Sequence, residues 1–230
     1  CWVQEDVKKL VAYSSVSHLG FCVLGLFSLN PSGLQGSLLY MINHGLSTGA
    51  LFLLIGMIYE RYHTRDMNRL GGLVTTMPIW SAFMVFFVLS SLAVPGLNGF
   101  VSEFLCLVGA FSATPDNAQW PGLLGPWYAV FAGTGMILAA MYLLYLTGRL
   151  VWGPHRAPPA DKNSGLPTDL STREIGLLLP LALMCVWLGI QPSGLMRTLE
   201  PSVERTLVAY PDLVPSQVES VAVLEEVTGG

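Results

Sequence analysis

Charge is what this sequence lacks most. Only 11% of its 230 residues are charged, whereas 52% are hydrophobic, and soluble domains carry about 25% charged residues. Three long stretches, residues 10–59, 119–148 and 175–196, contain no Asp, Glu, Lys or Arg. A helix crosses a bilayer in about 20 apolar residues, and each stretch is long enough for that. The composition therefore excludes a soluble domain and predicts an all-α polytopic membrane protein.

Cysteine is scarce and has no recognisable pattern. The four cysteines show no CxxC or other metal-ligand spacing, and three of them lie in apolar stretches, where cysteine packs as a small hydrophobe. No signal-peptide pattern is found at the beginning of the chain. These absences predict no metal site and leave the redox compartment open.

Hydrophobic runs predict about five transmembrane helices. Their approximate bounds are 10–27, 34–59, 78–112, 127–152 and 174–191, followed by a polar tail at 193–230 with one short helix near 200–210. The third run is too long for one straight crossing and too short for two. It contains Pro-Gly-Leu-Asn-Gly, and proline and glycine interrupt helices. We therefore predict a third helix that is broken between Pro95 and Gly99, where Asn98 and Gly99 cap and restart it.

Tryptophans and basic residues predict how the helices sit in the membrane. Interfacial aromatic belts would include the tryptophans near the proposed span ends, Trp80, Trp120, Trp127, Trp152 and Trp187. Counting the third run as one crossing puts nine of the eleven Lys and Arg residues on one side, whereas two crossings give seven against four. The positive-inside rule favours the single broken crossing. The C-terminus then faces the side opposite the cytoplasm.

One carboxylate stands alone inside the membrane region. Glu103 is the only formally charged residue between Leu70 and Pro115, and intramembrane carboxylates usually mark an ion or proton path. The dipole of the restarted helix favours its ionised form, whereas desolvation favours its neutral form. We therefore predict a proton site at Glu103. The alternative is a protonated, structural glutamate that binds carbonyls freed at the break.

Polar residues recur at helical spacing in the first two spans. Hydrocarbon cannot solvate such stripes, so they should face a neighbouring helix or a water-filled cavity. Histidine titrates near neutral pH, so we predict His18 and His44 as relay residues; a histidine that only bonds a neighbouring helix is the alternative. The other members are Ser14 and Ser17 in the first span and Tyr40, Asn43, Ser47 and Thr48 in the second, the latter four as accessory groups.

Lys8 and Lys9 precede the first span. We expect both side chains to extend to the membrane interface and to set topology. An inward, accessory role for one of them is the alternative.

Several segments carry a resemblance to one family. Residues 6–20 (DVKKLVAYSSVSHLG) resemble a late helix of the antiporter-like subunits of respiratory complex I. Residues 43–53, 59–65 and 95–104 (PGLNGFVSEF), together with 169–174 (DLSTRE) and 188–192, are similar to the M-type subunits, also called chain 4, of proton-translocating NADH–quinone oxidoreductase. The resemblance covers roughly residues 3–192.

The resemblance carries implications about sites and partners. It implies that His18 and His44 are central relay residues and that Glu103 is the terminal proton site. It also implies L-type and N-type antiporter-like subunits as partners, and NADH, FMN, iron–sulfur clusters and quinone bound in other subunits. No cofactor and no nucleic acid is expected on this chain. The membrane would be a bacterial plasma membrane or an organellar inner membrane.

The chain departs from the family pattern in length. Family members have fourteen crossings, so five crossings would be the C-terminal part of an antiporter-like fold, and a chain that begins with Cys1 rather than Met fits this expectation. The rivals are a cation/proton antiporter subunit, the membrane subunit of an energy-converting hydrogenase and a membrane scaffold without a titrating role. L-type subunits and antiporter proteins carry a lysine where this chain has Thr48 nearby, which favours the M type.

Overall fold

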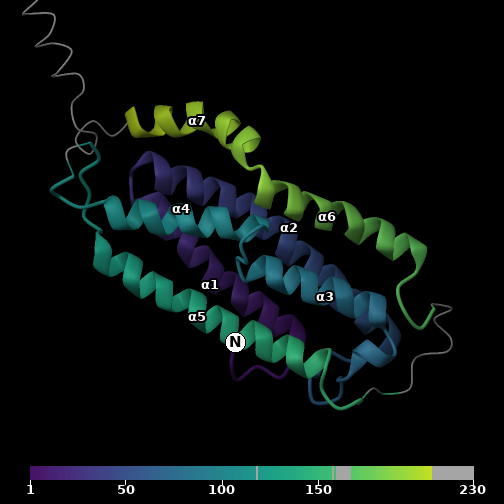
Figure 1. Ribbon diagram of the computed structural model, residues 1–230. Coiled ribbons are helices and arrows are strands. Elements are labelled where there is room, and N and C mark those ends of the chain that lie inside the picture. The colour runs from purple at the N-terminus through teal and green to yellow at the C-terminus, as the bar shows by residue number, and fades with distance from the viewer. Residues whose placement is uncertain (118, 157, 159–166, 209–230) are drawn as a thin grey trace, which may run out of the picture.

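Seven α-helices and one short 3₁₀ turn form the regular structure seen in a computed structural model of the chain (Figure 1). The structure describes residues 1–208 except 118, 157 and 159–166. The elements are α1 (Val7–Phe27), α2 (Pro31–Tyr62), η1 (Leu73–Thr75), α3 (Pro78–Ser91), α4 (Asn98–Ser112), α5 (Pro126–Leu150), α6 (Thr172–Ile190) and α7 (Ser193–Val208). By length and composition, α1, α2, α5 and α6 can each cross a membrane. The predicted all-α polytopic membrane protein is confirmed.

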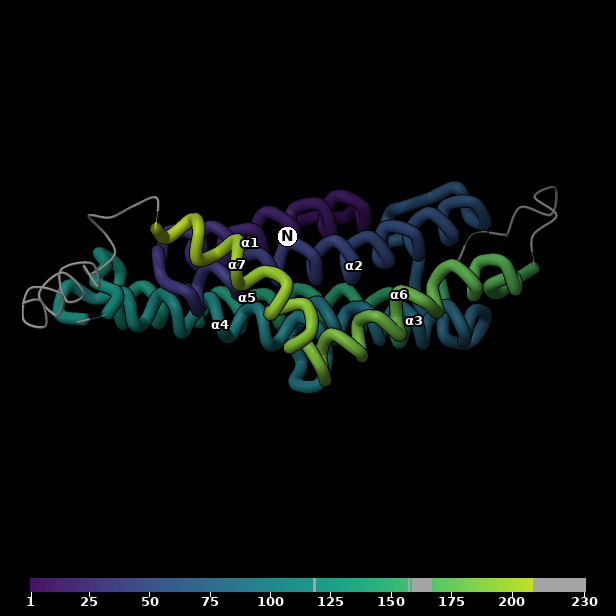
Figure 2. The backbone as a smooth tube through the Cα atoms, turned by 90° about the horizontal axis from the view of Figure 1, so that it is seen from above, coloured from purple at the N-terminus to yellow at the C-terminus, as the bar shows by residue number. Residues whose placement is uncertain are grey.

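The longest helix, α2, organises the bundle. It has 32 residues, and α3 and α4 lie end to end along it (Figures 1 and 2). Helices α1, α6 and α7 also pack against α2, whereas α5 packs against α1, α3 and α4. Seven of the twelve largest fully buried side chains, which include Leu54, Trp80 and Phe87, come from α2 and α3. Because α2 touches most other helices, its polar face is enclosed by protein.

The third hydrophobic run forms two helices, as predicted. Helix α3 ends at Ser91 and α4 begins at Asn98, and between them Ala93 and Gly96 have φ angles of 54° and 95°. With 14 and 15 residues, the two helices are about 21 and 22 Å long at 1.5 Å per residue. Neither alone matches a hydrocarbon core of about 30 Å. Placed end to end, they are long enough for the single broken crossing that the sequence predicts.

Asn98 has a different role from the predicted one. The N-cap of α4 is Leu97, and no side chain caps it. The Asn98 side chain instead accepts a hydrogen bond from Ser90 at the end of α3 and donates one to the Asn43 carbonyl of α2 over 3.1 Å. The prediction of a cap was wrong because the amide joins three helices across the break.

Three other expectations need correction. Helix α2 continues to Tyr62 rather than ending at Tyr59, because the charge of Arg61 is paired inside the protein. Trp80 is fully buried and donates its indole N–H to the Leu54 carbonyl over 3.0 Å, so it belongs to no interfacial belt. The short C-terminal helix is α7 at 193–208, with Pro201 inside it. The remainder of the predicted tail, 209–230, lies outside the described residues.

Gly189 of α6 rests against the break. A Cβ atom added there would lie 2.5 Å from Leu97 Cα, a distance that requires the backbone to move. We expect Gly189→Ala to lower the free energy of unfolding by about 1–3 kcal/mol, as overpacking does. The matched control is Gly176→Ala in the same helix, where a Cβ meets nothing within 4 Å. Denaturation of both variants in detergent checks this, and equal stability would contradict the close contact.

Candidate functional site

Glu103 lies at the centre of a buried polar cluster. It is in the second turn of α4 and is 3% exposed. The Tyr40 hydroxyl of α2 donates a short hydrogen bond to Glu103 Oε1, and His18 Nδ1 of α1 lies 3.5 Å from the same oxygen. Three helices therefore surround the lone carboxylate of this region with groups that can hold or pass a proton.

His18 connects two tyrosines. Its Nδ1 is 2.8 Å from the Tyr40 oxygen, and its Nε2 is 3.4 Å from the hydroxyl of Tyr142 in α5. Tyr142, His18, Tyr40 and Glu103 are all buried, and we call them the polar row. The row links α5, α1, α2 and α4 through successive polar contacts. Such a row can pass a proton by exchange of hydrogen bonds.

The Tyr142 end of the row borders a hollow. Tyr142 and Ser17 both line a space of about 560 Å³ between α1 and α5, together with other side chains of these helices and with Cys1 and Trp2 from the segment before α1. Ser14, by contrast, is buried and donates to the Val11 carbonyl of its own helix over 2.7 Å. His18 contacts the tyrosines of two other helices of the row, Tyr40 of α2 and Tyr142 of α5.

His44 lies beside the polar row and contacts its rings. Its ring centroid is 5.6 Å from that of His18 and 6.2 Å from that of Tyr40. Its Nδ1 is 3.2 Å from Thr48 Oγ1, one turn along α2. His44 is half-buried, so the structure brings the two predicted histidines together and leaves His44 at the edge of the cluster.

Asn43 ties α2 to the beginning of α4. Its Nδ2 donates to the Asn98 carbonyl over 2.6 Å and to Ser102 Oγ over 3.1 Å, and Asn98 returns a bond to the Asn43 carbonyl. Asn43 Oδ1 is buried without a hydrogen-bond partner in the described part of the chain. This reciprocal pair fixes α4 against α2 and so fixes the register of Glu103 opposite Tyr40.

The remaining predicted accessory residues contribute little to this cluster. Ser47 is buried but donates to the Asn43 carbonyl of its own helix over 3.2 Å. Lys8 and Lys9 are exposed, and their backbone N–H groups are capped by Asp6. Both lysines lie about 15 Å along α1 from His18 at 1.5 Å per residue. They are therefore placed at the end of the helix rather than in the polar row.

Tyr142 was missed at the sequence level. Helix α5 contains three tyrosines, of which Tyr128 and Tyr145 are exposed and Tyr142 is buried. The sequence does contain one signal: Tyr142, Leu146 and Leu150 are four residues apart and so share one face of the helix. Both leucines are buried. That signal identifies a buried face but not a partner 124 residues away.

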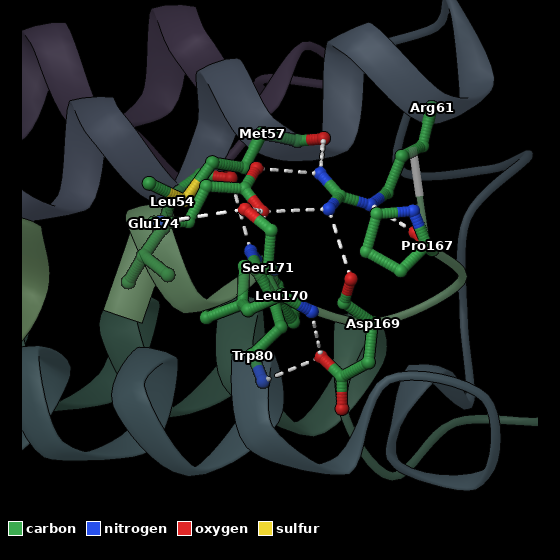
Figure 3. A network of polar contacts seen from close by, with 9 residues as sticks. All are labelled: Leu54, Met57, Arg61, Trp80, Pro167, Asp169, Leu170, Ser171 and Glu174. Atoms are coloured by element: carbon green, nitrogen blue, oxygen red, sulfur yellow. Dashed lines mark hydrogen bonds and ion pairs between the residues drawn. The ribbon is translucent and has the colours of Figure 1, made fainter. Parts of the chain in front are cut away.

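A second buried cluster joins α2 to α6 (Figure 3). Arg61 makes a two-pronged ion pair with Glu174, with both N–O distances 2.8 Å. The other contacts of the guanidinium, shown in Figure 3, are to three backbone carbonyls, those of Met57, Pro167 and Asp169. Arg61 is 2% exposed, and its guanidinium N–H groups all have hydrogen-bond acceptors within the protein.

Asp169 extends this cluster to α3. Its carboxylate accepts hydrogen bonds from the backbone N–H groups of Ile79 and Trp80, over 2.8 and 3.1 Å. These N–H groups lie in the first turn of α3, where the helix dipole favours a negative charge. Glu174 also completes a capping box with Ser171 at the beginning of α6. The segment before α6 therefore holds α2, α3 and α6 together, away from the polar row.

Comparisons with known proteins agree on one family. A model of a transmembrane family described as NADH:quinone oxidoreductase/Mrp antiporter matches residues 1–124.

No group of three potential metal ligands from His, Cys, Asp and Glu occurs among the residues that the structure describes.

Named relatives match most of this chain but only part of themselves. NADH-quinone oxidoreductase subunit M of Rhodobacter capsulatus is 39% identical over 90% of the chain and 38% of the relative. NADH-ubiquinone oxidoreductase chain 4 of Marchantia polymorpha is 42% identical over 87% of the chain and 37% of the relative. A chain of respiratory complex I from Thermus thermophilus superposes with a TM-score of 0.76 at 33% identity, covering 90% of this chain and 41% of that one. The chain spans about two fifths of the length of these proteins.

Proposed function

Because the chain belongs to the NADH:quinone oxidoreductase/Mrp antiporter transmembrane family, we propose that it is a proton-translocating M-type (chain 4) membrane subunit of an NADH–quinone oxidoreductase. The relatives named subunit M and chain 4 support this assignment. The observation that carries it is the polar row, which joins a buried carboxylate to a buried histidine through a tyrosine. A carboxylate in a membrane region is costly and usually functional.

Each site residue has a proposed part in proton movement. Glu103 binds a proton and releases it to one side of the membrane. His18 receives a proton at Nε2, on the side of Tyr142, and passes it on from Nδ1. His44, with Thr48 as its polar neighbour, lies close enough to influence the charge state of His18. Asn43 acts as a positioning residue, because it holds α4 in register with α2.

Electron transfer takes place elsewhere in this proposal. NADH, FMN, iron–sulfur clusters and quinone bind to other subunits, and a change of charge there propagates to the polar row through L-type and N-type antiporter-like neighbours. The protein resides in a bacterial plasma membrane or an organellar inner membrane. Its C-terminus faces the side opposite the cytoplasm or matrix, in accordance with the positive-inside rule.

A cation/proton antiporter subunit is the second candidate, because the family description includes Mrp antiporters. The test compares sealed vesicles from cells with and without the protein that contains this chain. We expect NADH oxidation by quinone and NADH-driven proton uptake both to be lost without the protein and restored on its re-expression. Loss of sodium/proton or potassium/proton exchange with NADH oxidation unchanged would instead identify an antiporter.

A further inference from the structure

Tyr40 occupies the space between the two titratable groups of the row. Its oxygen is 2.8 Å from His18 Nδ1, and its hydroxyl donates to Glu103 Oε1 through a short contact. His18 and Glu103 are themselves 3.5 Å apart, beyond the usual 2.7–3.2 Å of an N–H···O hydrogen bond. All three side chains are 3% exposed, so bulk water has little access to the gap.

We propose that the Tyr40 hydroxyl carries the proton between His18 and Glu103, an inference that rests on the proposed function of this site. Two short hydrogen bonds offer a better path than one long direct contact. Other bridging groups are less well placed: the His44 ring centroid is 5.6 Å from that of His18, and His44 forms its hydrogen bond with Thr48. Tyr142 contacts His18 on the opposite nitrogen.

The transfer balances without any other reactant. A protonated His18 gives its Nδ1 proton to the Tyr40 oxygen while the original Tyr40 proton moves to Glu103 Oε1. One N–H and one O–H bond break, and two O–H bonds form. A cationic imidazole and a carboxylate become neutral imidazole and carboxylic acid, and Tyr40 is unchanged. After Glu103 releases its proton, rotation of the Tyr40 hydroxyl from Nδ1 toward Oε1 resets Tyr40. His18 becomes cationic again once its ring turns to present its unprotonated nitrogen to the side of Tyr142 and binds the next proton there.

The test uses Tyr40→Phe in the assembled oxidoreductase in sealed vesicles, with Tyr59→Phe as the matched control. Tyr59 is in the same helix but is exposed, beneath Arg65, and should pump like the wild type. Phenylalanine fills the space without a hydroxyl, so we expect Tyr40→Phe to lower proton translocation at least about tenfold, below the 10²–10⁴ range of a positioned acid–base group because the direct contact remains. The infrared carbonyl band of protonated Glu103 should also shift, since its hydrogen-bond partner is lost.

The outcomes separate this inference from the proposed function. Normal pumping in Tyr40→Phe, with pumping lost in Glu103→Gln, would show that His18 and Glu103 exchange the proton directly, and the role of Tyr40 would be overturned. Normal pumping in both variants would overturn the proposed function itself. If Tyr40→Phe does not assemble, fluorotyrosine is introduced at position 40 instead. It keeps the shape and the hydroxyl of tyrosine but makes the hydroxyl more acidic, so a hydroxyl that carries the proton should change the pumping rate. A changed pumping rate supports the role of Tyr40, and an unchanged rate overturns it.

Discussion

Glu103→Gln is expected to abolish NADH-driven proton translocation while the complex remains assembled. Glutamine keeps the shape of the side chain and an oxygen that can accept from Tyr40, but it cannot bind and release a proton. The loss should be about 100-fold or more, at the low end of what a positioned acid–base group contributes. Proton uptake and NADH oxidation are measured together in sealed vesicles, and both should fall because the two processes are coupled.

The control for this experiment is Glu204→Gln. Glu204 is exposed on α7, outside the polar row, so the same chemical change there should leave pumping and oxidation at wild-type rates. If Glu103→Gln pumps as well as the control, Glu103 is the structural glutamate of the alternative interpretation. Its hydrogen bond to Tyr40 would then serve only to join α2 and α4.

Arg61→Met is expected to produce the largest loss of stability. Glu174 would remain buried without its partner, and the carbonyls of Met57, Pro167 and Asp169 would lose a donor. Removing one partner of a buried ion pair costs about 3–5 kcal/mol, mainly because the other charge stays desolvated. Unfolding of the purified protein in mixed micelles by titration with sodium dodecyl sulfate measures the loss.

Two further variants define the cause of this loss. Arg65→Met should cost at most about 1 kcal/mol, because Arg65 is 41% exposed and its contact with Asp6 is 3.6 Å. Combining Arg61→Met with Glu174→Leu should be less damaging than Arg61→Met alone, because no unpaired charge is then left. Equal stability of Arg61→Met and Arg65→Met would mean that the Arg61–Glu174 ion pair contributes little to the fold.

The helix break between α3 and α4 and the lone carboxylate could both be predicted from the sequence. Runs without charged residues predict the spans, and proline and glycine predict the helix break. The isolation of Glu103 among uncharged residues predicts that its carboxylate is functional. The spacing of Tyr40, Asn43 and Ser47 also predicted one polar face of α2, and all three are buried. These features depend on neighbours along the chain, where helical periodicity directly relates sequence to space.

Contacts between distant helices could not be predicted in the same way. Tyr142 and His18 are 124 residues apart, and Arg61 and Glu174 are 113 residues apart. The sequence places each residue on a helix face but does not say which faces meet. The predicted second span, 34–59, leaves Arg61 outside it, and Asn98 was predicted as a cap, whereas both are bound by residues from other helices.

The Arg61–Glu174 ion pair joins two parts of the chain that are synthesised at different times. Arg61 is synthesised 113 residues before Glu174. Ile79 is synthesised 90 residues before Asp169, whose carboxylate accepts its N–H. During that interval the Arg61 guanidinium has the Met57 carbonyl as an acceptor but lacks Glu174 and the carbonyls of Pro167 and Asp169, and the first N–H groups of α3 lack the Asp169 carboxylate. We therefore expect α2 and α3 to reach their final packing only after α6 is in place.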